Sequence, residues 1–131
     1  MLFLVVLFLL SPIQTQPPIE EPFSCFDELP VPKYPTLARF GGRQGEVRAT
    51  ILFTTGTPEV QVAGPENLLN EEVKKSLTGA TARSSCRGKT GNIRVVFQLD
   101  RRRLECPENT FVLRPPDTLV VRSTLPPVSP K

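Results

Sequence analysis

Apolar and polar residues alternate in two neighbouring stretches in the middle of the chain. Residues 45–54 place apolar side chains at odd positions and mostly polar ones at even positions. After the turn-forming residues 55–58, Val60 and Val62 alternate with polar neighbours. Strict alternation is typical of a strand with one buried face, and a short turn between two such strands favours an antiparallel hairpin. We therefore predict two paired strands here.

A third stretch of alternation runs from Asn92 to Leu99 and is predicted to be a strand as well. Val96 interrupts its polar side, which indicates that this face is partly covered. The apolar side holds Ile93, Val95, Phe97 and Leu99, and the polar side holds Asn92, Arg94 and Gln98.

Two helices are predicted, one before the first strand and one between the second strand and the third. Pro35 suits the first position of a helix, and the Gly41–Gly42 pair ends it. Asn70 is a good N-cap for the second helix, which Gly79 closes. An apolar stripe that can pack on a sheet recurs every four residues. It consists of Leu69, Val73 and Leu77.

The first ten residues, MLFLVVLFLL, form an unbroken apolar run. Ten helical residues span about 15 Å, roughly half the hydrocarbon thickness of a bilayer. This length fits the apolar region of a secretory signal peptide, although no Lys or Arg precedes it. We predict a signal peptide over residues 1–16 and a periplasmic or secreted protein, with membrane association only if this segment is retained.

Prolines are concentrated in the two flanks of the chain and are rare in its centre. Only two of the 15 prolines lie between Gly41 and Cys106. Proline-rich stretches are extended and pack poorly, which favours one folded domain between two open ends. The predicted organisation is a Pro-rich leader over residues 17–33, a domain over 34–123 with a C-terminal extension from residue 100, and a disordered tail over 124–131. The leader is either a linker that orders on contact or a recognition motif, and residues 110–113 and 118–122 are candidates for two short extra strands.

The composition removes the commonest catalytic and metal-binding groups. The 131 residues include no histidine, which removes the usual general base, the Ser-His and Cys-His nucleophile pairs and the commonest zinc ligand. No pair of carboxylates forms an evident acid–base motif, and no Cys-x-x-Cys occurs. We therefore expect a protein that is not an enzyme, with no catalytic residues, no metal and no cofactor.

Three cysteines leave one over if two of them pair in an exported chain. Cys86 and Cys106 bracket the third predicted strand, and a bridge between them is the favoured prediction. Closing a loop of about twenty residues would stabilise the fold by roughly 3 kcal/mol through chain entropy. Bridges from Cys25 to Cys106 or to Cys86 stay open as alternatives, and either would attach the leader to the domain.

Basic residues gather around the third predicted strand, while the net charge of the chain is only +3. Charged strand ends that keep an edge soluble explain this arrangement in structural terms. The functional alternative is a basic patch for anionic envelope polymers or lipid head groups. Nucleic acid is not expected, because no aromatic residues are interleaved with the arginines. The candidate patch comprises Arg83, Arg87, Lys89, Arg101, Arg102 and Arg103.

The order helix–strand–strand–helix–strand resembles the C-terminal domain of TonB-family proteins over about half of the chain. In that family a Tyr-Pro-x-x-Ala start precedes a Gly-x-Val strand and a glycine turn. A Val-x-Val strand that ends in glycine follows, and then a helix start of two leucines and an acidic or amide residue. The matching residues here are Tyr34, Pro35, Ala38, Gly45, Val47, Gly56, Val60, Val62, Gly64, Leu68, Leu69, Asn70 and Glu71.

This resemblance implies an α+β fold in which a small three-stranded antiparallel sheet packs against two helices, with room for extra C-terminal strands. It also implies a non-enzymatic periplasmic module that binds a segment of an outer-membrane receptor by adding it as a strand to a sheet edge. Formation of a homodimer stays open. The edge strand that binds the partner would be the third strand, with residues Asn92, Ile93, Arg94, Val95, Val96, Phe97, Gln98 and Leu99.

The sequence differs from the TonB family in features on which the family's transport function depends. The apolar run is too short for a transmembrane anchor, the leader is too short to span the periplasm, and the aromatic-proline element before the last strand is absent. Two alternatives therefore stand beside the binding module. One is a basic surface module for anionic envelope polymers or lipids, and the other is a truncated membrane-anchored TonB energy transducer with a misplaced start codon.

Overall fold

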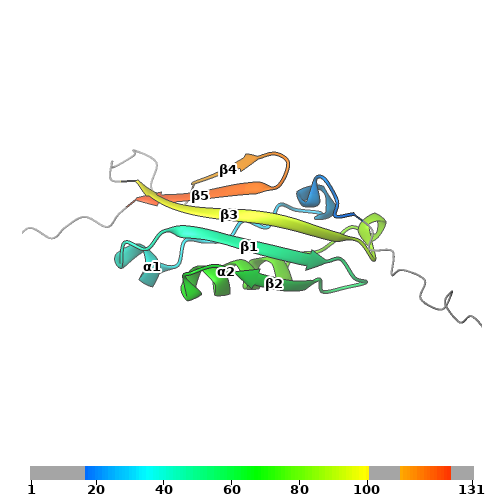
Figure 1. Cartoon of the computed structure of the whole chain (residues 1–131), viewed down its shortest axis with the longest axis horizontal. Coiled ribbons are helices and arrows are strands. Elements are labelled where there is room, and N and C mark those ends of the chain that lie inside the picture. The colour runs from blue at the N-terminus through cyan, green and yellow to red at the C-terminus, as the bar shows by residue number, and fades with distance from the viewer. Residues whose placement is uncertain (1–16, 101–109, 125–131) are drawn as a thin grey trace, which may run out of the picture.

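The computed structural model describes residues 17–100 and 110–124, which form one β-sheet with helices and the N-terminal leader packed on one face (Figure 1). In chain order the elements are η2 (Pro22–Cys25), α1 (Thr36–Phe40), β1 (Gly45–Leu52), β2 (Glu59–Ala63), α2 (Asn67–Thr78), η3 (Ser84–Cys86), β3 (Thr90–Asp100), β4 (Thr110–Arg114) and β5 (Thr118–Thr124).

The five strands lie in the order β2-β1-β3-β5-β4. β1 is antiparallel to both β2 and β3, β4 is antiparallel to β5, and β3 is parallel to β5. The α+β class is thus confirmed, with one main helix, α2, and one short helix, α1. The sheet is larger than the predicted three antiparallel strands, because the candidate strands in the C-terminal extension form β4 and β5 and make the sheet mixed.

The alternation of the sequence sets which side of each strand is buried. In β1 and β3 the odd-numbered positions from Val47 and from Ile93 face the core, and the even-numbered positions on the other side are exposed or partly covered. Leu69, Val73 and Leu77 bury the apolar stripe of α2 against this face, where the helix contacts β1 and β2. We call the buried side of the sheet the core face and the other side the open face.

The predicted start of α2 is wrong by four residues, because Asn70 was expected to be the N-cap. The helix begins at Asn67 with Glu66 as its N-cap, and Asn70 lies within it. The Asn70 amide instead donates to the carbonyl of Gly64 over 2.8 Å, which ties the first turn of the helix to the end of β2. Gly79 ends the helix as predicted.

The Pro-rich leader packs into the same core as the helices. Phe23, Cys25 and Phe26 are buried, and the Phe26 ring meets the Phe53 ring edge to face at 5.4 Å between centroids. Gly91 in β3 allows this close approach, since a Cβ there would lie 2.8 Å from the Cβ of Pro22. The folded unit therefore begins before Tyr34.

Some predicted features lie outside the residues that the structure describes. These are the signal peptide over 1–16, the arginines 101–103, Cys106 and the tail from residue 125. Within 17–100 and 110–124, none of the helices has the length and apolar character that crossing a membrane requires.

Candidate binding edge

The structure corrects the prediction that residues 92–99 form an edge strand. β3 pairs with β1 from Thr90 to Phe97 and with β5 from Arg94 to Asp100. The physical reason is the C-terminal extension, whose last strand occupies the side of β3 that was predicted to be open. A partner strand cannot add to β3 while β5 is in place, because each backbone N–H and C=O can serve only one ladder at a time.

The side chains of β3 follow the predicted alternation. Ile93, Val95, Phe97 and Leu99 are buried on the core face. On the open face Asn92 and Arg94 are exposed, while Val96 and Gln98 are partly covered. Val96 faces Val120 of β5 in register, and Val120 is only 2% exposed. The prediction that this face is partly covered around Val96 is confirmed.

β4 is one of the two edge strands of the sheet, and none of the described strands pairs with its outer side. All five of its residues are exposed, and they include three consecutive large apolar side chains. Phe111 is 48% exposed, Val112 43% and Leu113 40%. An unpaired strand with an apolar surface is a ready template for pairing with another chain. Sequence reasoning proposed a strand at this place but did not identify it as the open edge.

Hydrogen bonding in β5 shows which backbone groups of β4 bond to β5 and which point away from it. The N–H of Arg94 donates to the carbonyl of Asp117 over 2.9 Å, so the Asp117 carbonyl points toward β3. Successive strand residues direct their backbone groups to opposite sides. Odd-numbered residues of β5 therefore bond to β3, and even-numbered residues bond to β4.

The register of the β4–β5 pair completes this assignment. Thr110, Val112 and Arg114 face the even-numbered residues of β5 and use their backbone groups in that ladder. The N–H and C=O groups of Phe111 and Leu113 consequently point away from the sheet. We call these four outward backbone groups, with the side chains of residues 110–114, the β4 edge.

An apolar pocket lies beside one end of the β4 edge. Its volume is about 340 Å³, and its walls come from the leader and from the turn between β4 and β5. Phe23 and Leu29 form the leader side, while Leu113, Pro115 and Pro116 form the other side. The pocket therefore continues the apolar surface of the β4 edge toward the leader.

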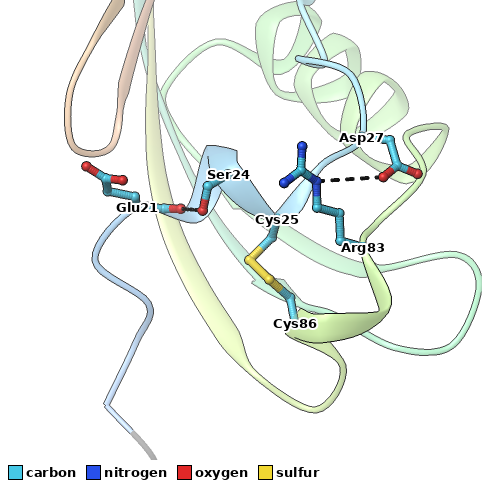
Figure 2. The surroundings of a disulfide bond; sticks show 6 residues. All are labelled: Glu21, Ser24, Cys25, Asp27, Arg83 and Cys86. Atoms are coloured by element: carbon cyan, nitrogen blue, oxygen red, sulfur yellow. Dashed lines mark hydrogen bonds and ion pairs between the residues drawn. A yellow bond between two sulfur atoms is a disulfide. The ribbon is translucent and has the colours of Figure 1, made fainter.

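The residues of the predicted basic patch fall on both sides of β3 in the sequence. Arg83, Arg87 and Lys89 precede β3, whereas the arginines at 101–103 follow its last residue and lie outside the described residues. The eleven residues of β3 separate Thr90 from Asp100 by about 33 Å at ~3.3 Å per residue. Arg83 also pairs with Asp27 of the leader at 3.8 Å (Figure 2).

Three arginines on the open face, Arg48, Arg94 and Arg122, have carboxylates beside them. Arg94 and Arg48 face each other across β1 and β3, and Glu46 forms an ion pair with both. Arg122 of β5 pairs with Asp100 at 3.1 Å. The open face is thus mixed in charge rather than basic.

The disulfide joins Cys25 to Cys86, which corrects the favoured Cys86–Cys106 bridge and agrees with one of the alternatives (Figure 2). The reason is the path of the leader along the loop before β3. The N–H of Arg83 donates to the Cys25 carbonyl over 2.7 Å, and Phe26 forms a β-bridge with Ala82. These contacts bring Cys25 next to η3, where the Cα atoms of the two cysteines lie 5.8 Å apart.

Tyr34 fixes the end of the leader to the sheet. Its ring meets the Phe97 ring edge to face at 5.3 Å, and its hydroxyl donates to the carbonyl of Arg43. Burial raises the pKa of the Tyr34 hydroxyl to about 12, because the charged phenolate would lose its hydration. Among the described residues, no three His, Cys, Asp or Glu side chains lie close enough to hold a metal ion.

No family model, curated protein or solved structure with which the chain was compared matches it. The resemblance to the TonB C-terminal family therefore stays a prediction, and the geometry of the site has to support any functional proposal by itself.

Proposed function

We propose that this protein is a non-enzymatic, extracytoplasmic binding module that captures an extended polypeptide segment as a sixth strand on the β4 edge. The single observation behind this proposal is the apolar edge strand β4, whose outward backbone groups at Phe111 and Leu113 face no other strand of the described residues. The Cys25–Cys86 disulfide supports the compartment, since disulfides persist in oxidising environments outside the cytoplasm.

The β4 edge defines the chemistry of a suitable segment. Backbone hydrogen bonds to Phe111 and Leu113 would supply affinity without regard to sequence, as in other cases of strand addition. Apolar side chains opposite Phe111 and Leu113 would cover the core side of the edge. Arg114 forms no ion pair with any described residue, so a carboxylate opposite it would add charge complementarity.

This proposal keeps the binding mode that the resemblance implies and moves it to another strand. An outer-membrane receptor segment is one partner of the right chemistry, and a role in outer-membrane transport belongs to the same proposal. The basic surface module gains no support, because Arg48, Arg94 and Arg122 on the open face lie beside carboxylates. The anchored transducer depends on residues outside the described part of the chain.

Selection from a phage-displayed library of random peptides tests strand addition. The immobilised protein should enrich peptides with apolar residues at alternate positions. Phe111→Pro removes an outward N–H and leaves the ladder to β5 intact, whereas Phe111→Ala shortens the side chain and keeps the N–H. Selected peptides should bind the Pro variant at least about tenfold more weakly than the Ala variant, since each lost hydrogen bond also leaves a buried group unpaired. Equal binding to the two variants, both with native circular dichroism, would exclude strand addition at β4.

A further inference from the structure

We propose that the β4 edge also accepts a second copy of this chain, so that two sheets join through antiparallel pairing of β4 with β4. This inference rests on the proposed use of the β4 edge and adds a defined partner and register. The described surface also has a hollow over β1 and β3 on the open face and a cleft beside Asp27 and Ser76, but neither lies at an edge of the sheet.

The outward backbone groups select one register. An antiparallel pair exchanges two hydrogen bonds wherever outward residues of both strands lie opposite each other. Only a two-fold axis through Val112 places Phe111 opposite Leu113 of the second copy and Leu113 opposite Phe111 of the second copy. Both outward residues of each strand are then used, and four backbone hydrogen bonds join the copies. An axis through Phe111 or through Leu113 would use only one outward residue of each strand.

The same register matches the side chains. Residues opposite each other in a sheet project to the same face, and such pairs stabilise it. On the core face Phe111 meets Leu113 of the second copy, and on the open face the two Val112 side chains meet. Arg114 lies opposite Thr110 of the second copy, so no like charges face each other. Each of the three exposed apolar residues of β4 then gains an apolar neighbour on its own face of the sheet.

The apolar pocket also gains an occupant in this register. Leu113 is one of its walls, together with Phe23 and Leu29 of the leader. Phe111 of the second copy lies opposite Leu113, so its ring is placed next to the mouth of the pocket. The two-fold axis repeats this contact at the other end of the paired strands.

The size of the contact sets the expected strength. Two five-residue strands bury less than the ~800 Å² per partner of a standard stable interface. We therefore expect a dimer with a Kd in the micromolar range or weaker, which forms and dissociates with concentration.

Sedimentation velocity over roughly 1 µM to 1 mM protein measures this equilibrium. The full chain should shift from monomer to dimer across the range. Phe111→Pro removes one N–H from each copy and so two of the four hydrogen bonds. Its dimer should be roughly 30-fold weaker than that of Phe111→Ala. A chain that is monomeric throughout the range, or two variants with equal dimer affinity, would overturn the self-pairing.

Cysteine cross-linking tests the register independently, in a Cys106→Ser background. The two Val112 residues form a non-hydrogen-bonded pair with Cα atoms ~4.5 Å apart, within the range that a disulfide spans. Oxidised glutathione should therefore convert Val112→Cys to a covalent dimer. Thr110→Cys is the matched control, since its two copies lie about 14 Å apart. Equal cross-linking of both variants would overturn the register.

The two proposals can fail separately. Peptides that bind through the Phe111 N–H to a chain that never dimerises would retain strand addition and exclude self-pairing. A dimer that cross-links through residue 112, with no enrichment of strand-forming peptides, would retain the pairing and exclude the broader binding function.

Discussion

The two edge strands of the sheet have the same length and different surfaces. β2 buries Val60 on the core face, where α2 packs against it, and exposes Glu59 and Gln61 on the open face. β4 exposes all five residues, with apolar side chains on both faces. Charged and polar side chains on an edge discourage pairing with other chains. The difference indicates that one edge is protected and the other is available.

Loss of the disulfide should lower the stability of the protein more than any other change proposed here, and it should affect the β4 side of the sheet more than the β2 side. The bridge spans 61 residues of sequence, so Cys25→Ser with Cys86→Ser should lower the free energy of unfolding by about 4 kcal/mol. The leader contacts β3, and hydrogen exchange should therefore accelerate at β3, β5 and β4 more than at β2. Urea denaturation measures the first effect. Cys106→Ser, which keeps this bridge, is the control, and uniform exchange across both edges would contradict the prediction.

An aspartate placed in each edge strand should destabilise the protein more in β2 than in β4. Val60 is 8% exposed, so Val60→Asp buries a carboxylate without a partner and should cost about 3 kcal/mol. Val112 is 43% exposed, and Val112→Asp should cost less than about 1 kcal/mol. Thermal and urea denaturation of the pair measure the difference. Similar losses at both sites would show that β4 is not open.

Alkaline pH should loosen the leader side of the molecule. Burial raises the pKa of Tyr34 from 10.0 to about 12, so the unfolded chain ionises first and stability falls between these pH values. The full effect is at most about 3 kcal/mol. Tyr34 is the only tyrosine and the chain has no tryptophan, so absorbance at phenolate wavelengths reports this residue alone. A midpoint near 10 in the folded protein would contradict the prediction, and Tyr34→Phe should abolish the signal.

The smallest effect is expected at Glu46, between the two edges on the open face. Glu46→Gln leaves Arg48 facing Arg94 across the strands and should cost no more than about 1 kcal/mol at low salt. Added NaCl should restore most of this loss, because it screens the repulsion. Glu59→Gln on β2 is the control, since Glu59 has no ion pair among the described residues. If the loss of stability did not depend on the salt concentration, its cause would be altered packing at Glu46 and not repulsion between Arg48 and Arg94.

Local patterns identified most of the individual elements. Alternation located β1, β2 and β3 to within two residues, because each has one face in the core and one in solvent. The apolar stripe of α2 was identified for the same reason. The start of that helix was missed because Asn70 resembles an N-cap, while its side chain bonds to Gly64, a contact that depends on where β2 ends.

Which distant strands and cysteines pair with each other could not be predicted from the sequence. β5 is covered on both faces and lies between β3 and β4, and neither property follows from the spacing of residues 118–124. The disulfide partner of Cys25 likewise depends on the path of the leader over the sheet. The candidate binding edge was missed for one reason: residues 110–114 become an edge only when β5 takes the place beside β3.

The position of β5 has a consequence for the order of synthesis. The strand made last of the five lies inside the sheet, so β3 has an open side until residues 118–124 exist. Until β5 is in place, residues 94–100 are the edge of the sheet, and the pairing of β5 with β3 transfers that role to β4.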